Sequence, residues 1–317
     1  MITGATKNKV DAIWQKMWEG GITNPLDVIT NLTYLMFMRQ LDEKELETES
    51  MESMLGEPLD HIFPETYQND HGETISGREM RWSHFKDKRA EDMYRIVERF
   101  AFPFIKTLGD ESAYSRAMEN ATFGFPAGKP ALLEKAVTGV DELLCDFDEH
   151  ISDLGDLYEY MLSKLSTAGT NGQFRTPQHI RDMMVGLIDP KPGEPICDPA
   201  CGTAGFLISA AEHIRNRYEG SMTSDQWDAF TGANGADPQF SGFDMDQTML
   251  RISAMNLMMH EVVSPDVRYL DSVSQKNDIS GKFDVILANP PFTGYVDVED
   301  IDKSLRAIVD SKQTELL

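Results

Sequence analysis

Cysteine is scarce in this sequence of 317 residues, which contains only Cys145, Cys197 and Cys201. An odd number of cysteines, with one close pair that no second pair or nearby histidine matches, argues against a disulfide framework and against a structural zinc site. No metal is therefore expected.

Long apolar runs are also missing. The longest in the first third of the chain, Leu32–Met38, is interrupted by Thr33 and falls far short of the roughly 20 apolar residues that span a bilayer. The opening sequence MITGATKNKV lacks the apolar block and the small-residue cleavage site of a secretory signal. These absences predict a cytoplasmic protein that has no membrane partner.

Basic residues are few, and the 53 acidic residues outnumber the 29 basic ones to give a net charge of −24 at pH 7. Non-specific attraction to nucleic acid needs lysine and arginine to displace counterions from the phosphates. If this chain works on DNA, another molecule should therefore hold the DNA. The hydrophobic fraction of 41% and the charged fraction of 26% are ordinary for a folded protein, and the length favours two domains.

The first half of the chain has the pattern of a helical domain. Apolar residues recur at helical spacing in segments 28–36 and 93–100, and such stripes usually form core. Segments 57–73 and 125–130 combine proline, glycine and mixed charges, which is typical of connecting loops. We expect a helical domain over residues 1–165.

Short apolar runs alternate with helical patterns in the second half of the chain. Segments 206–218 and 248–262 have helical periodicity and separate strand-like runs, which predicts a parallel sheet with helices on its faces. Residues 166–317 are thus expected to form a Rossmann-like, doubly wound α/β domain. The polar stretch 220–239 is predicted to be a surface excursion. The expected strands are 194–198, 240–244, 266–270 and 283–288.

A glycine-containing loop follows the first expected strand, with the sequence Asp198-Pro-Ala-Cys-Gly-Thr-Ala-Gly205. Glycines let the backbone turn tightly and approach a ligand, and a carboxylate at a strand end can bind a polar ligand group. The loop lacks both the GxGxxG dinucleotide pattern and the Gly-Lys-Ser/Thr of a phosphate loop. Taken alone, it is either a ligand loop or a plain tight turn.

A second segment, Asn289-Pro290-Pro291-Phe292, follows the fourth expected strand. Proline fixes the backbone and donates no hydrogen bond, so the Asn289 amide oxygen and the Pro290 carbonyl can act as paired acceptors. Two acceptors that hold the hydrogens of a conjugated amine would turn the nitrogen lone pair toward an incoming methyl group. Phe292 offers a face on which a flipped base can stack. Taken alone, the segment could be a simple turn, but a doubly wound sheet places its first and fourth strands side by side at the switch point.

Together, these two segments resemble the cofactor loop and catalytic tetrapeptide of gamma-type amino-methyltransferases. The chain resembles modification subunits of type I restriction-modification systems in particular. The resemblance lies in the sequence of the loop, in the phenylalanine at the end of the tetrapeptide and in the sequence GQFRTP at 172–177. Segments 24–28 and 34–38 are similar to the helical domain of that family. The resemblance implies DNA adenine-N6 methylation with S-adenosylmethionine as cofactor. The implied partners are a specificity subunit, a restriction (nuclease) subunit, a second modification subunit, and double-stranded DNA held mainly by the specificity subunit.

The resemblance also implies a role for each matching residue. Asp198 and Gly202 would contact the methionine part of the cofactor, and Asp244 would accept its ribose hydroxyls. Asp271 would lie near the adenine amine. The catalytic residues would be Asn289, Pro290, Pro291 and Phe292, and the other cofactor-binding residues would be Phe174, Thr176, Ala200 and Thr203.

The sequence also supports predictions for Thr176, Ala204 and Cys201. Thr176 before Pro177 is typical of a helix N-cap, and that helix end could receive the cofactor carboxylate or could serve for capping alone. Ala204 stands where the family often has glycine, and we expect it to have an ordinary backbone angle. Cys201 is interpreted as a small loop residue, because the methyl group is already activated and needs no enzyme nucleophile.

Few residues follow Phe292, whereas the resemblance implies about three further strands. The chain is therefore expected to be an amino-terminal fragment with an open sheet edge. Two alternatives remain open. The chain could be a non-catalytic piece that binds the cofactor or a partner subunit, or it could methylate another amine or amide, such as RNA adenine or protein glutamine.

Overall fold

A computed structural model of the chain describes residues 4–108, 113–145, 152–167, 176–233, 235–290 and 300–306. The chain divides into two compact units. The first consists of Met1–Asp110 and Glu119–Ala168, and the second of Glu111–Met118 and Gly169–Leu317. Within the described residues, no helix has the length and apolar character needed to span a bilayer.

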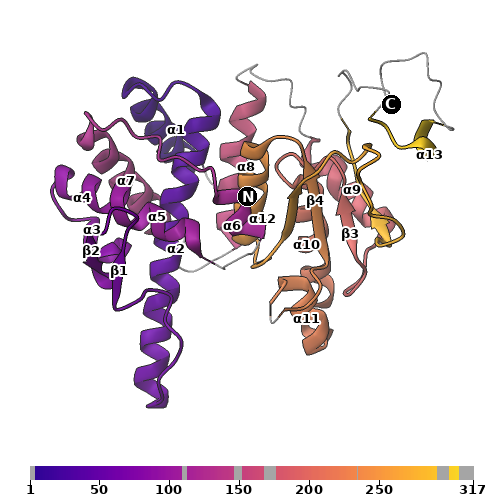
Figure 1. The fold of residues 1–317 in the computed structure, drawn as a ribbon, viewed down its shortest axis with the longest axis horizontal. Helices are drawn as coiled ribbons and strands as arrows, with labels where there is room; N and C mark the ends of the chain where they lie inside the picture. Colours follow the sequence, from indigo (N-terminus) through magenta and orange to yellow (C-terminus); the bar gives the residue numbers. More distant parts are fainter. Residues whose placement is uncertain are drawn as a thin grey trace. The chain divides into compact units, whose positions relative to one another are not determined.

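The first unit is mainly helical, as the sequence predicts, and α2 (Pro25–Leu55) is its long central helix (Figure 1). The N-cap Asn24 accepts the Leu26 N–H, and Gly56 ends the helix in a left-handed conformation with φ of 72°, as capping rules favour. A π-helical turn at Val97–Ala101 joins α4 to α5. The other helices are α1 (Gly4–Glu19), η1 (Gly77–Met80), α3 (Trp82–Phe85), α4 (Ala90–Ile96), α5 (Phe102–Thr107), α7 (Pro130–Leu144) and α8 (Ser152–Thr167).

Segment 57–73 is not only the loop that the sequence predicts. Its end forms β1 (Thr66–Gln68), which pairs antiparallel with β2 (Thr74–Ser76). The side chain of Asn69 closes the turn by accepting the backbone N–H of Glu73 at 2.9 Å. Each strand is only three residues long and the second buries a single side chain, so the alternation is too short to be recognised in the sequence.

The second unit contains a four-stranded parallel sheet with the order β5-β4-β3-β6. The chain runs outward from β3 to β5 and then returns to the other side of β3, which places the switch point between β3 and β6. The predicted doubly wound sheet and the predicted neighbourhood of its first and fourth strands are confirmed. The strands are β3 (Ile196–Asp198), β4 (Phe240–Asp244), β5 (Asp266–Tyr269) and β6 (Val285–Ile286).

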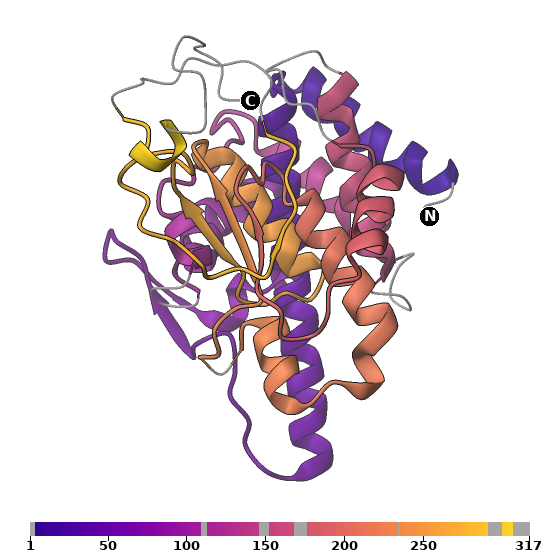
Figure 2. The same ribbon diagram turned by 90° about the vertical axis from the view of Figure 1, so that its right-hand side faces the viewer.

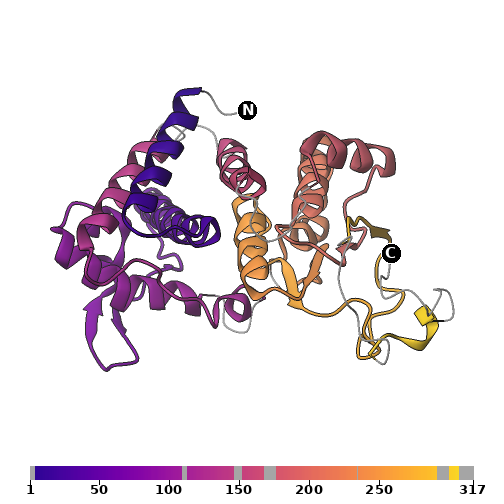
Figure 3. The same cartoon turned by 90° about the horizontal axis from the view of Figure 1, so that it is seen from above.

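Helices α10 (Gly205–Tyr218) and α12 (Gln247–Met259) cover one face of this sheet, and α9 (Gln178–Ile188) packs beside α10 (Figures 2 and 3). The shared face follows from two successive parallel crossovers in the same direction, which have the same hand. Helix α6 (Ala113–Met118) packs against α12 and β5. The short elements η4 (Glu219–Ser221) and α13 (Lys303–Arg306) complete the described helices of this unit.

The prediction that 220–239 is a surface excursion is wrong for its middle part. Helix α11 (Ser224–Thr231) forms there and buries Phe230 completely, edge-on against Phe240 at a centroid distance of 5.3 Å. The polar residues are cap residues rather than loop residues, because Thr223 and Gln226 form a capping box. A helix this short offers too few apolar positions for a periodic pattern.

Replacing Thr223 by alanine should lower the free energy of unfolding by about 1 kcal/mol, the usual cost of losing an N-cap side chain. The hydroxyl is the acceptor for the Gln226 N–H, and alanine leaves that donor without its partner. Urea denaturation followed by circular dichroism measures the change. Thr223→Ser keeps the acceptor and should remain within a few tenths of a kcal/mol of the wild type; equal losses in both variants would contradict the capping explanation.

Candidate cofactor-binding and catalytic site

The loop between β3 and α10 contains two left-handed residues. Gly202 has φ of 51° and Ala204 has φ of 64°. The expectation of an ordinary backbone angle at Ala204 is therefore wrong. Alanine in this region costs about 1–2 kcal/mol, so this loop holds a bend that glycine would adopt without strain.

Two carboxylates at the ends of neighbouring strands hold the loop. Asp198, at the end of β3, accepts the Ala200 N–H at 3.0 Å. Asp244, at the end of β4, accepts the Gly202 N–H at 3.0 Å. The Cys201 N–H donates to the carbonyl of Phe243 at 2.9 Å, so the loop is fastened across the carboxyl edge of the sheet.

Two side chains that sequence reasoning missed also hold this loop. Asn256 on α12 is fully buried and donates from Nδ2 to the Thr203 carbonyl at 2.8 Å. Ser272, just after β5, donates its hydroxyl to the Pro199 carbonyl at 2.5 Å. The signal for Asn256 was a lone amide in the apolar stretch 252–259, because a buried amide needs a partner. The sequence offers no comparable signal for Ser272.

The electrostatic character of the site is set by buried acids. Burial raises the pKa of Asp198, the Ala200 N–H lowers it and the charge of Asp244 raises it, and together these effects bring it to about 7. Burial also raises the pKa of Asp244, against the lowering effect of the N–H groups of Asp246 and Gly202. A buried carboxylate of this kind favours a cationic ligand group, because a nearby positive charge restores the ionised form.

Cys201 is buried in the loop, and its sulfur lies 3.7 Å from the hydroxyl of Ser253. Burial raises the pKa of its thiol well above the usual range, as does the charge of Asp198. The thiol is therefore protonated at neutral pH, and a protonated thiol is not a nucleophile.

Asn289 and Pro290 lie just beyond the end of β6 and form the Asn-Pro corner. The Leu287 N–H donates to the Cys197 carbonyl at 3.0 Å, which extends the β3–β6 pairing up to the level of Asp198. Asn289 and Pro290 therefore lie on the same edge of the sheet as the loop. Pro291, Phe292 and Phe174 lie outside the described residues.

Thr176 does not cap a helix, so that prediction is wrong. The N-cap of α9 is Pro177, whose carbonyl accepts the N–H groups of Ile180 and Arg181. The hydroxyl oxygen of Thr176 instead accepts a hydrogen bond from Asn289 Nδ2 at 2.9 Å. The residue before a proline avoids helical angles, which agrees with the position of Thr176 outside α9.

The four polar side chains that the sequence singled out at strand ends thus lie along one edge of the sheet. Asp271 follows β5, and its carboxylate accepts the Val273 N–H at 3.0 Å. Asp198, Asp244 and Asn289 follow β3, β4 and β6. This is the edge at which open α/β sheets bind their ligands, next to the switch point.

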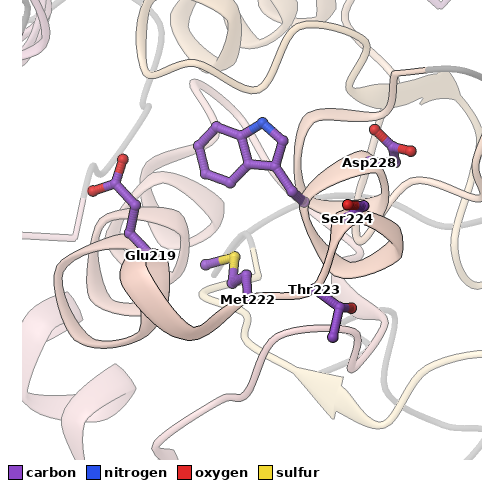
Figure 4. Close-up of a pocket in the computed structure, with 6 residues that line it drawn as sticks. Glu219, Met222, Thr223, Ser224 and Asp228 are labelled. Carbon is purple, nitrogen blue, oxygen red and sulfur yellow. The ribbon is translucent and has the colours of Figure 1, made fainter.

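An open hollow elsewhere in this unit is not part of the site. It is lined by Met222 and Trp227 together with Glu219, Thr223, Ser224 and Asp228 (Figure 4). Gln226 of α11 donates to the Pro192 carbonyl at 3.3 Å, and Pro192 precedes β3. The hollow therefore lies toward the amino ends of the strands, whereas the loop and the Asn-Pro corner lie at their carboxyl ends.

A helical unit joined to a parallel sheet of this order, with its switch point between β3 and β6, defines a Rossmann-like α/β architecture. Comparison with known sequences then gives the family. The chain belongs to the N-6 DNA methylase family, which residues 149–313 match, and residues 6–140 match the HsdM N-terminal domain.

Three individual proteins that match most of this chain are methylase, methyltransferase or modification subunits of type I restriction systems. The EcoEI methylase subunit of a type I restriction enzyme from Escherichia coli is 27% identical over 306 residues, which are 93% of this chain and 57% of that protein. A type I modification subunit from Vibrio vulnificus YJ016 has the same fold, with a TM-score of 0.66 at 21% identity over 98% of this chain and 64% of that one. A type I methyltransferase subunit from Streptococcus thermophilus has a TM-score of 0.59 at 17% identity, over 92% of this chain and 63% of that one. The chain thus spans somewhat less than two thirds of the length of these relatives.

Proposed function

We propose that this chain carries the cofactor-binding and catalytic parts of an S-adenosylmethionine-dependent DNA adenine-N6 methyltransferase, the modification subunit of a type I restriction-modification complex. One observation carries the proposal. The Asp198–Ala204 loop and the Asn289–Pro290 corner follow two strands, β3 and β6, that pair directly in parallel. A single cofactor and a single target amine can therefore meet between them.

The cofactor would lie across the strand ends. When bound, S-adenosylmethionine supplies a methyl group already activated by a positively charged sulfur. Asp198 would face the cationic methionine part together with Gly202, and the buried position of its carboxylate fits that charge. Asp244 would accept the ribose hydroxyls, and Asp271 would lie near the adenine amine. Ala200 and Thr203 would complete the loop, and Phe174 and Thr176 would belong to the segment that closes over the cofactor.

The Asn-Pro corner would act on the amine that receives the methyl group. The Asn289 amide oxygen and the Pro290 carbonyl would each accept one hydrogen of the adenine N6 amine. Acceptors held in place before the reaction favour the geometry in which the nitrogen lone pair faces the methyl carbon. As a second proline, Pro291 would restrict the backbone of this segment, and Phe292 would stack on the flipped base.

The chain would act within a complex in which another subunit binds most of the DNA. A chain with a net charge of −24 has little electrostatic attraction for phosphates, which supports a specificity subunit as the main DNA-binding partner. A restriction subunit and a second modification subunit would complete the assembly. The likeness to type I methylase subunits supports this set of partners.

Methyl transfer from tritiated S-adenosylmethionine tests the proposal. We expect label in N6-methyladenine of duplex DNA when the specificity subunit is added, and none in RNA or in protein glutamine. Label in RNA or in protein alone would select a different substrate. Cofactor binding without transfer to any of these substrates, in the presence of the partner, would reduce the chain to a non-catalytic scaffold.

A further inference from the structure

The hydrogen bond between Thr176 and Asn289 joins two segments that are distant in sequence. Thr176 lies immediately before α9, and Asn289 lies three residues beyond the end of β6. Their side chains meet at 2.9 Å between Nδ2 and Oγ1, and the bond is partly buried. The Thr176 hydroxyl therefore occupies the nitrogen end of the same amide whose oxygen end is proposed to hold the target amine.

Both partners in this hydrogen bond precede a proline, Pro177 and Pro290. The residue before a proline is restricted to extended backbone angles. Each side chain therefore starts from a backbone with little freedom, and forming the bond orders few additional angles.

The segment that carries Thr176 is itself tied to the cofactor loop through two helices. Ser209 of α10 donates to Asp182 of α9 at 2.9 Å. The guanidinium of Arg181 on α9 lies against Gly205, where a side chain would collide with it at 2.3 Å. Because α10 continues directly from the loop, α9 connects the loop to the Asn-Pro corner.

An asparagine amide has two ends of nearly the same shape and opposite hydrogen-bonding character. A corner that holds an amine needs the oxygen end, because the nitrogen end would oppose the hydrogens of the substrate. A partner that accepts from the nitrogen end fixes which end of the amide lies on which side. We propose that Thr176 is a positioning residue that holds the Asn289 amide with its oxygen toward the target amine, an inference that rests on the proposed function.

Paired variants of Thr176 test this role. Thr176→Val keeps the branched shape and removes the hydroxyl, and it should lower kcat for methyl transfer about fivefold to tenfold, as expected for one neutral hydrogen bond. Its Kd for S-adenosylmethionine, measured by calorimetry, should change less than kcat does. Thr176→Ser restores the hydroxyl and should recover most of the rate. Thr138→Val makes the same change at an exposed helical position and should leave the rate unaltered.

A double-mutant cycle separates positioning from a general structural effect. In the Asn289→Ala background, Thr176→Val should cause no further loss of rate, because the side chain on which Thr176 acts is gone. Additive losses would overturn the proposal. A loss of cofactor affinity with unchanged kcat would also overturn it and would assign Thr176 to cofactor binding alone.

A measurement without turnover keeps this inference distinct from the proposed function. The side-chain NH2 signals of Asn289, in protein labelled with 15N-asparagine, are assigned by their absence from Asn289→Ala. We expect one of the two protons to shift and to exchange faster with water in Thr176→Val, and to keep the wild-type behaviour in Thr176→Ser. Unchanged signals in Thr176→Val would contradict the positioning role of Thr176 even if the wild type methylates DNA. Absence of methyl transfer by the wild type with its partner would instead contradict the proposed function.

Discussion

Replacing Asn289 by alanine should lower the rate of methyl transfer about 100-fold to 1000-fold, the loss typical of removing one preorganised electrostatic partner of a reacting group. The amide of Asn289 is proposed to accept one hydrogen of the target amine, and alanine has no group that can take its place. The Kd for S-adenosylmethionine should change little, because the cofactor contacts are assigned to the Asp198–Ala204 loop. Single-turnover assays with tritiated cofactor measure the rate, and calorimetry measures the affinity.

Asn8→Ala is a suitable control for this experiment. Asn8 lies on an exposed face of α1, so the same chemical change there should leave both rate and affinity at the wild-type level. A rate within threefold of wild type in Asn289→Ala would remove the corner from catalysis. A large loss of cofactor affinity in that variant would place Asn289 in the cofactor site instead.

The second large effect concerns the affinity of Asp198 for the cofactor and its dependence on pH. The pKa of Asp198 is raised from an ordinary value of 3.8 to about 7, chiefly by burial. A cationic ligand interacts with the ionised form, so binding should release a proton near neutral pH, and affinity should fall by up to about tenfold per unit below the pKa. Calorimetry in buffers of different ionisation enthalpy measures both the affinity and the released proton.

Asp198→Asn should weaken S-adenosylmethionine about 10-fold to 100-fold at pH 8, as expected when a hydrogen bond to a charged group is lost. The variant should also lose most of the difference between pH 6 and pH 8. Asp60→Asn removes an exposed acid of the helical unit and should bind as the wild type does. An unaltered pH dependence in Asp198→Asn would show that another group binds the proton.

The same pKa also fixes how Asp198 affects folding of the cofactor-free protein. Because its pKa is higher in the folded state than in the unfolded state, the folded protein binds the proton more readily between about pH 4 and pH 7. The contribution of this group to stability is therefore largest in acid and is lost as the pH rises through 7. Asp198→Asn should accordingly raise the free energy of unfolding at pH 8. Such an increase would show that the weak binding of this variant does not come from misfolding.

The general architecture could be predicted from sequence because it depends on repeated patterns. The four strands of the second unit appeared as short apolar runs separated by helical periodicity, and the order of a doubly wound sheet follows from handedness rules. The polar residues Asp198, Asp244, Asp271 and Asn289 could be placed on one edge because parallel strands share their carboxyl ends.

The details that were missed depend on single contacts. Ala204 has a left-handed backbone at the point where the loop enters α10, and the composition of the segment gives no sign of that strain. Thr176 resembles an N-cap, but its hydroxyl has a partner far along the chain, which local capping rules cannot foresee. Helix α11 was missed because its few apolar residues, such as Phe230, do not make a periodic stripe.

The proline that follows Asn289 also bears on the chemical ageing of the protein. Asparagine loses its side-chain nitrogen mainly when the backbone nitrogen of the next residue attacks the amide, and the nitrogen of Pro290 has no hydrogen to give up. Asn234 precedes Gly235 and has no such protection. The amide at the corner should therefore outlast others in the chain, so that an old molecule keeps the group on which its proposed chemistry depends.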